Sequence, residues 1–326
     1  MRKELLKIEN LKKKFSVSTK LYEKKQEFLA VDDVSFSLFE GETFGLVGES
    51  GCGKSTLAKL ILRLVDATDG KIIYNNKNIF DLKKPEMKQV RKDIQIIFQD
   101  PQASLNPRMT IGQTISEGFY VHNLGSGAER LTRTKELLDM VGIHKESINM
   151  YPHEFSGGQR QRIGIARALS VNPKVIIADE PVSALDVSIQ AQILNLLKDL
   201  QERLNLTYLF ISHDLRIVEY LSDRVGVMYL GKMMELAESV SLYSQPLHPY
   251  TKALLSAVPN IDPKKKSKRI ILAGDVPNPV NPPSGCVFHP RCGYAKDVCK
   301  EKVPELQEVK QGHFSACLLC KEIFLA

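Results

Sequence analysis

Apolar residues follow two patterns along the chain. In residues 34–39 (VSFSLF) apolar and polar side chains alternate, which predicts a strand with one buried face. Short uninterrupted apolar runs, typical of strands buried on both faces, occur at 43–47, 94–98, 175–178 and 208–212. The first two thirds of the chain is therefore expected to contain a sheet.

Helical patterns separate these strands. We expect helices over about 54–64 and over 187–204, and residues 112–172 are expected to be mostly helical. Strands that alternate with helices favour a mostly parallel sheet covered on both faces. The predicted fold class is therefore α/β, with an inserted helical lobe at about 100–172.

The composition changes after about residue 240. Prolines cluster between 246 and 290, and five of the six cysteines lie between 286 and 320. We therefore predict a large domain over 1–259 and a small cysteine-rich C-terminal domain over 260–326.

The overall composition is that of an ordinary folded protein. Of the 326 residues, 43% are hydrophobic and 25% are charged, which excludes a disordered chain, a collagen or a coiled-coil rod. No window reaches the ~18–20 consecutive apolar residues of a membrane span, and the basic N-terminus lacks the apolar stretch of a signal peptide. We expect a protein that stays on the cytoplasmic side.

The net charge of +7 comes mainly from residues 2–25, and a second basic run lies at 264–269. Such runs could contact nucleic acid or anionic lipid. No nucleic-acid-binding motif or interleaved aromatic residue accompanies them, so we favour a solvated surface and predict no nucleic-acid partner.

Residues 48–55 (GESGCGKS) match the phosphate-loop pattern G-x-x-x-x-G-K-[ST], between a predicted strand and a predicted helix. Glycines let backbone N–H groups approach phosphate oxygens, and the helix N-terminus adds partial positive charge. In this pattern Lys54 contacts the β- and γ-phosphates, and Ser55 offers a hydroxyl ligand to Mg²⁺. The expected nucleotide-binding residues are Gly48, Glu49, Ser50, Gly51, Cys52, Gly53, Lys54, Ser55 and Thr56.

Two further motifs carry chemistry. An apolar run ends in two acids at 175–180 (VIIADE), where Asp179 can complete a Mg²⁺ shell and Glu180 can orient or deprotonate an attacking water. A second glycine-rich helix start at 155–159 (FSGGQ) exposes backbone donors to an anion. One explanation of this segment is purely structural, a helix capped by Ser156. The alternative is a second phosphate-binding surface, which would act in trans on a nucleotide bound by another copy of the fold.

In this order the motifs resemble those of ATP-binding cassette (ABC) subunits, over residues 1 to about 240. Gln99 follows a strand as the family's glutamine does, residues 183–186 resemble its D-loop, and His213 stands where its switch histidine is found. The resemblance implies a head-to-tail dimer that sandwiches two ATP molecules and hydrolyses them with Mg²⁺. It implies Lys54, Glu180 and His213 as catalytic residues, Ser55, Gln99 and Asp179 as Mg²⁺ ligands, Gln99 also at the nucleotide, and Ser156, Gly157, Gly158, Gln159 and Asp186 as contacts to the partner's ATP.

In such subunits the adenine usually stacks on an aromatic ring upstream of the phosphate loop. Phe15, Tyr22 and Phe28 are candidates, and Tyr22 is favoured.

Residues 245–259 and 274–292 resemble the C-terminal extension of oligopeptide and dipeptide importer ATPases, the F-type subunit in particular, and SLNPR at 104–108 agrees. This resemblance implies two transmembrane permease subunits, a second ATPase subunit of the D type and an extracytoplasmic peptide-binding protein. The chain would lie at the cytoplasmic face of the cell membrane. Related importers carry nickel, glutathione or other small solutes, which remain alternative cargoes.

Four cysteines, Cys286, Cys292, Cys299 and Cys317, lack the paired spacing of most zinc ribbons, and disulfides are disfavoured in the cytoplasm. In the resembled family these positions ligate a [4Fe–4S] cluster. A cluster is therefore expected, with zinc or reduced thiols as alternatives and Cys320 as an extra thiol.

Two other functional classes compete. Non-transport ABC ATPases carry long coiled coils or tandem cassettes, whereas this chain has one cassette and no heptad run. A regulatory module that only holds ATP would not need Glu180 and His213. We therefore predict an ATP hydrolase that drives peptide import.

Overall fold

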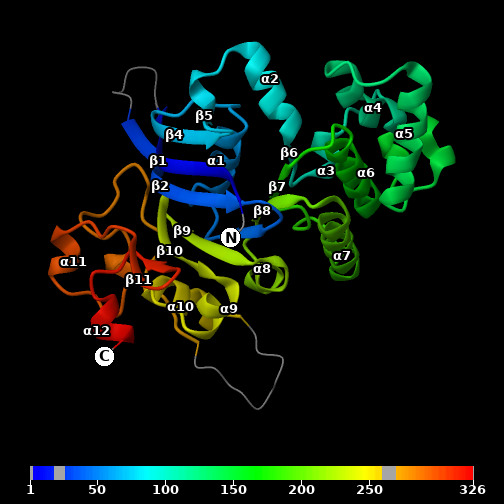
Figure 1. Cartoon of the computed structure of the whole chain (residues 1–326). Helices are drawn as coiled ribbons and strands as arrows, with labels where there is room; N and C mark the ends of the chain where they lie inside the picture. Colours follow the sequence, from blue (N-terminus) through cyan, green and yellow to red (C-terminus); the bar gives the residue numbers. More distant parts are fainter. Residues whose placement is uncertain (1–2, 18–25, 259–268, 326) are drawn as a thin grey trace. The chain divides into compact units, whose positions relative to one another are not determined.

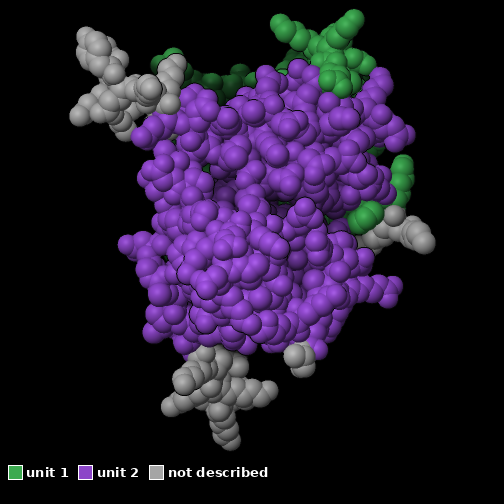
Figure 2. Space-filling model, turned by 90° about the vertical axis from the view of Figure 1, so that its left-hand side faces the viewer, with its two compact units in different colours: residues 1–3, 39–42, 81–211 green, residues 4–38, 43–80, 212–326 purple. Residues whose placement is uncertain are grey.

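The computed structural model describes residues 3–17, 26–258 and 269–325 (Figure 1). The chain divides into two compact units. Unit 1 comprises residues 1–3, 39–42 and 81–211, and unit 2 comprises residues 4–38, 43–80 and 212–326 (Figure 2). The expected domain boundary at 259/260 lies outside the described residues, and a separate small C-terminal domain is not shown.

Unit 1 contains three adjacent parallel strands, β6 (Ile94–Ile97), β7 (Val175–Asp179) and β8 (Thr207–Ile211), with β7 in the middle. Every residue of β7 and β8 is buried. The runs at 175–178 and 208–212 are therefore confirmed as buried strands, whereas the run at 94–98 forms a strand that is only partly buried and ends at Ile97.

The helical lobe of unit 1 is built from α4 (Ile111–Val121), α5 (Gly127–Met140) and α6 (Gly157–Leu169), which pack against one another (Figure 1). Each begins with a capping box, in which a Ser or Thr accepts from the third helical N–H. The other helical segments of unit 1 are α2 (Lys84–Asp93), α3 (Pro101–Ser104), η2 (Lys145–Asn149), η3 (Pro152–Glu154) and α7 (Val187–Leu204).

One sheet of unit 2 mixes parallel and antiparallel strands. In it β3 (Thr43–Val47) runs parallel to β9 (Arg224–Tyr229), which pairs antiparallel with β10 (Lys232–Glu238). The sheet continues through β12 (His313–Ser315) to β11 (Gln307–Lys310). The C-terminal strands thus extend the sheet that contains β3.

The second sheet of unit 2 has the order β2-β1-β4-β5. Its strands are β1 (Glu4–Val17), β2 (Gln26–Phe39), β4 (Asp69–Tyr74) and β5 (Lys77–Asn78). Burial alternates along the second half of β2, which confirms the period-two pattern of residues 34–39.

The helices of unit 2 are short. The first one ends three residues before the expected residue 64, because Arg63 has a left-handed φ of 48° that cannot continue a helix. The helical segments are α1 (Lys54–Ile61), η1 (Ile79–Asp81), α8 (Leu215–Leu221), α9 (Ser239–Ser244), α10 (Pro249–Ser256), η4 (His289–Arg291), α11 (Val298–Glu301) and α12 (Cys320–Phe324).

Candidate functional site

The phosphate loop of unit 2 joins the buried strand β3 to helix α1. Its backbone requires glycine at two positions. Gly48 has φ 155° and Gly53 has φ 108°, and a Cβ at either would lie 2.2 Å from a backbone oxygen, of Met228 and Ala30 respectively. Only glycine fits both the dihedral angles and the space, so this loop is shaped to expose its N–H groups.

Lys54 begins α1 and is 5% exposed. Its ammonium donates to the carbonyl oxygens of Gly48 at 2.7 Å and Glu49 at 3.1 Å, and it lies 3.6 Å from the Cys52 sulfur. Burial raises the pKa of the Cys52 thiol, although Lys54 opposes this, so Cys52 stays a neutral thiol. The loop therefore holds one positive charge at the N-terminus of a helix, where an anion is favoured.

Glu49 has hydrogen-bond partners that could not be expected from the sequence. Its backbone N–H donates to the Tyr250 hydroxyl at 3.1 Å, and its carboxylate accepts from both Nη groups of Arg291 at 2.8 and 3.3 Å. Arg291 is 242 residues away along the chain, and no local signal connects such distant positions. The C-terminal part of unit 2 therefore contacts the phosphate loop directly.

The acidic strand end in unit 1 gathers three of the expected residues. Asp179 ends β7 and is 9% exposed. Glu180 follows it with a φ of 48°, and its N–H donates to the Ile211 carbonyl at 2.9 Å. The amide of Gln99 donates to the Glu180 carboxylate at 2.9 Å. A non-glycine residue held in the left-handed region is a strained arrangement that is enriched at functional sites.

The glycine-rich turn before α6 forms the expected cap. The Ser156 hydroxyl accepts from the Gln159 N–H at 3.3 Å, and the Gln159 side chain accepts from the Ser156 N–H at 2.9 Å. Ser156 and Gly157 are exposed, whereas Gly158 is buried and a Cβ there would lie 2.5 Å from Ile189. The capping explanation is therefore correct for this chain by itself, and it leaves the turn accessible.

The remaining expected residues are placed as follows. His213 is exposed in unit 2, just before α8, and Asp186 is exposed in unit 1 at the start of α7. Tyr22 lies outside the described residues. The other two aromatic candidates, Phe15 and Phe28, lie with their ring centroids 5.9 Å apart.

The prediction of an iron–sulfur cluster is wrong. Among the described residues, which include all six cysteines, no group of three or more His, Cys, Asp or Glu side chains is arranged to hold a metal ion. Cys286, Cys292, Cys299 and Cys317 line a cavity of about 20 Å³, room for roughly one water molecule. Burial raises the pKa of the Cys286 and Cys292 thiols and raises that of Cys317 to about 12.

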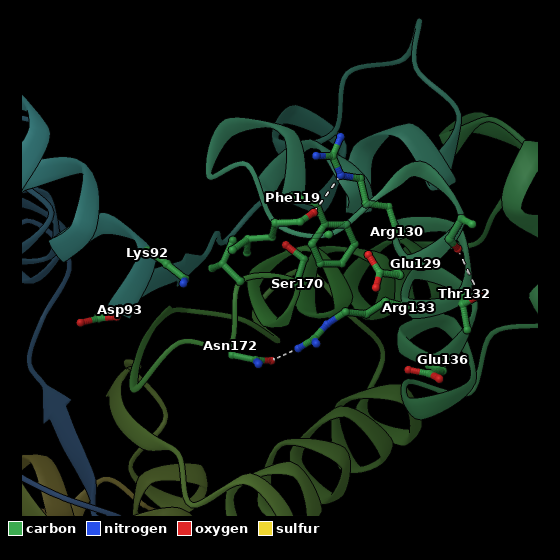
Figure 3. Close-up of a pocket in the computed structure, with 14 residues that line it drawn as sticks. Lys92, Asp93, Phe119, Glu129, Arg130, Thr132, Arg133, Glu136, Ser170 and Asn172 are labelled. Carbon is green, nitrogen blue, oxygen red and sulfur yellow. Dashed lines mark hydrogen bonds between the residues drawn. The ribbon is translucent and has the colours of Figure 1, made fainter.

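A larger cavity of about 670 Å³ lies in unit 1, next to α4 and α5 (Figure 3). Arg133 spans it toward the end of α6, where its guanidinium donates to the side chain of Asn172, and Arg130 donates to the Leu124 carbonyl at 2.8 Å. The charged side chains of its lining are of both signs, namely Lys92, Asp93, Glu129, Arg130, Arg133 and Glu136. A surface of this kind suits a segment with both polar and apolar side chains.

Comparison with known proteins gives two family matches. The ABC transporter family matches residues 31–183, and the C-terminal region of oligopeptide/dipeptide transporters matches residues 234–299. Within the described residues, no helix combines the length and the apolar character needed to cross a membrane.

Individual relatives are similar over nearly the whole chain. The oligopeptide transport ATP-binding protein AppF of Bacillus subtilis (strain 168) is 56% identical over 320 residues, 97% of each chain. OppF of Haemophilus influenzae, also an oligopeptide transport ATP-binding protein, is 54% identical over 91% of this chain and 90% of its own. The dimeric post-hydrolysis structure of the ATP-binding cassette MJ0796 bound to ADP and Pi aligns with a TM-score of 0.64 and 31% identity, over 72% of this chain and 99% of that one.

Proposed function

Because the chain belongs to the ABC transporter family, in its oligopeptide/dipeptide branch, we propose that it powers an importer of oligopeptides or dipeptides by binding and hydrolysing ATP. The main support for this proposal is that one chain contains both a phosphate loop whose conformation requires glycine and a segment that matches the C-terminal region of oligopeptide/dipeptide transporters. The relatives named for oligopeptide transport support the same cargo.

The phosphate loop binds the triphosphate. Backbone N–H groups of the loop and of the start of α1, together with the Lys54 ammonium, supply donors and positive charge. Lys54 is already oriented by the carbonyl oxygens of Gly48 and Glu49, so little reorganisation is needed when phosphate arrives.

The residues assigned to Mg²⁺ fit that ion chemically. Ser55, Asp179 and Gln99 offer a hydroxyl, a carboxylate and an amide oxygen, and magnesium prefers hard oxygen ligands. The hydrogen bond from Gln99 to Glu180 uses the amide nitrogen and not the oxygen. When bound, Mg²⁺ would neutralise part of the negative charge of the phosphates.

Glu180 orients or deprotonates the attacking water. Its strained backbone and the hydrogen bond from Gln99 hold the carboxylate in one orientation, which favours a positioned base. His213 is assigned to the γ-phosphate, where an imidazole N–H can donate to phosphate oxygen. Catalysis of phosphoryl transfer is mostly positioning and charge stabilisation, which these residues provide.

The Ser156 turn serves the ATP of a partner subunit. One chain has one phosphate loop, so the exposed residues Ser156 and Gly157 at the second glycine-rich helix start are assigned to a nucleotide held by another cassette. Gly157, Gly158, Gln159 and Asp186 join Ser156 in this contact. We assign the partner as a second ATPase subunit of the D type in a head-to-tail dimer; the dimeric structure of the similar cassette MJ0796 supports pairing with a second cassette.

The importer also requires two transmembrane permease subunits and an extracytoplasmic peptide-binding protein. We assign the cavity beside α4 and α5 to a cytoplasmic segment of a permease, because its lining is both charged and apolar (Figure 3). Tyr120 and Leu131 on the same two helices are also exposed. Bound there, the chain lies at the cytoplasmic face of the membrane. Residues 260–326 form the C-terminal appendage of peptide importers.

Two variants test two separate roles: ATP binding by the phosphate loop of this chain, and the contact of the Ser156 turn with the ATP of the partner subunit. Replacing Lys54 by Ala in the full chain should weaken ATP binding about 100-fold, the loss expected for charge-assisted hydrogen bonds, as measured by calorimetry. Gly157→Asp should abolish ATP turnover of the assembled transporter, because a negative charge would face the partner's phosphate.

The chain offers a matched control for Gly157. Gly127 stands at the same helical position, directly after the Ser126 cap of α5, and has open space around it. Gly127→Asp should therefore leave turnover unchanged. Unaltered ATP affinity in Lys54→Ala, or equal turnover in both glycine variants, would refute the assignment.

A further inference from the structure

The C-terminal part of unit 2 contacts the phosphate loop through the side chain of Arg291. The side chain of Arg291 is 9% exposed, and its guanidinium forms a two-pronged ion pair with Glu49. Such forked Arg–carboxylate pairs are stronger and geometrically stricter than single contacts. The Nε atom of Arg291 is buried and has no hydrogen-bond partner among the described residues, so the side chain is held by the contacts of its two Nη groups.

A cluster of aromatic rings supports Arg291. Its Nη1 also lies 3.4 Å from the Tyr229 hydroxyl, and the Tyr229 ring packs against Tyr250 and Phe288 with centroids 4.8 and 5.4 Å away. Tyr250 is the residue whose hydroxyl accepts from the Glu49 N–H. The same cluster therefore holds both the side chain and the backbone of Glu49.

The Glu49 backbone carries this constraint to the phosphate-binding lysine. Its carbonyl oxygen accepts from the Lys54 ammonium at 3.1 Å. A shift of the Glu49 backbone would move one of the two carbonyl groups that aim that ammonium. Two hydrogen-bonded steps thus connect Arg291 with Lys54, entirely within unit 2.

Charge gives a second reason for the contact. Glu49 places a carboxylate inside a loop whose ligand is a polyanion, and an unpaired carboxylate there would repel phosphate. Burial alone would lower the pKa of Arg291, but its hydrogen bonds to Glu49 and Tyr229 and the charge of Glu49 together raise it. Arg291 therefore remains charged and compensates Glu49 throughout the range in which ATP binds.

We propose that Arg291 is a positioning residue for ATP binding: by pairing with Glu49 it neutralises the loop carboxylate and fixes the carbonyl group that aims Lys54. This inference rests on the assignment of residues 48–55 as the ATP site. It gives the C-terminal region of peptide transporters a direct part in nucleotide affinity.

The experiment measures how ATP affinity depends on the pair. The dissociation constant of Mg·ATP is determined by calorimetry on the full chain, and KM and kcat for ATP are determined in the assembled transporter. Arg291→Gln should raise the dissociation constant and KM about tenfold, with kcat at saturating ATP nearly unchanged. Arg291→Lys keeps the positive charge but loses the two-pronged geometry, so it should raise the dissociation constant and KM only about threefold. This variant replaces Arg291→Gln in the test if the Gln variant does not fold.

A double-mutant cycle isolates the contact. In a Glu49→Gln background, Arg291→Gln should change the dissociation constant less than about twofold, because the pair is already broken. Lys300→Gln is the matched control, since it removes an exposed ion pair with Asp297 from the same C-terminal segment without touching the loop. It should leave the affinity unchanged.

The inference is overturned if Arg291→Gln leaves the affinity for ATP unchanged or lowers only kcat. It is also overturned if Arg291→Gln weakens ATP binding as much in the Glu49→Gln background as in the wild type. Lys54→Ala in the same titration separates this failure from a failure of the site. If Lys54→Ala abolishes binding while Arg291→Gln does not weaken it, only the role of Arg291 is wrong. If Lys54→Ala binds normally, the ATP site itself is wrongly assigned.

Discussion

At the scale of single residues, the phosphate loop is the part most fully encoded in local sequence. Gly48, Gly53 and Lys54 were predictable because they belong to a short motif with fixed spacing. The structure shows why glycine is needed at 48 and 53: both have positive φ angles and close backbone contacts. Arg291 was not predictable. Its role depends on where a distant segment packs, and a single arginine carries no spacing to detect.

The steric demand at Gly53 gives a direct prediction. Gly53→Ala should lower the stability of the chain by about 2 kcal/mol or more and abolish ATP binding, because its Cβ would meet the Ala30 carbonyl at 2.2 Å in a backbone with φ 108°. Urea unfolding and ATP titration measure both effects. Gly293→Ala, where nothing lies within 4 Å, is the control and should be close to neutral.

At the scale of elements, the pattern of apolar residues placed the buried strands and α7 (Val187–Leu204) correctly. It did not place the C-terminal strands, since β11 and β12 are short and mostly polar in sequence. Helix ends also depend on single backbone angles, as Arg63 shows at the end of α1. The iron–sulfur prediction failed because cysteine spacing shows which cysteines are close along the chain and not whether their side chains form a metal-binding group.

Helix α10 should make the stability of the chain dependent on pH. His248 is its N-cap, and Nδ1 accepts from the Tyr250 N–H at 3.1 Å, which requires a neutral ring. Burial lowers the pKa of His248 to about 3. Between about pH 6.5 and pH 3 the unfolded chain therefore binds a proton that the folded chain does not, so stability is full above pH 6.5 and falls as the pH decreases.

The measurement is urea unfolding at pH 7.5 and pH 5. The wild type should lose about 2 kcal/mol more than His248→Asn between these two values, since Asn can cap the helix but does not titrate. Equal losses in the two proteins would show that His248 does not carry the dependence.

At the scale of the whole molecule, the functional residues are distributed over both units. The phosphate loop and His213 belong to unit 2, and Gln99, Asp179, Glu180 and the Ser156 turn belong to unit 1 (Figure 2). The order of these motifs could be predicted from sequence, because each is a short local pattern. Their use in an importer depends on other subunits, which is why transport must be measured in the complete assembly.

The most direct test is therefore ATP-dependent uptake of a labelled oligopeptide into vesicles that contain both permease subunits, both ATPase subunits and the binding protein. Wild-type chain should support uptake. Glu180→Gln should bind ATP with unchanged affinity yet reduce uptake by at least about 100-fold, as expected for loss of a positioned general base. Undiminished uptake with Glu180→Gln would contradict the claim that ATP hydrolysis at this subunit drives peptide import.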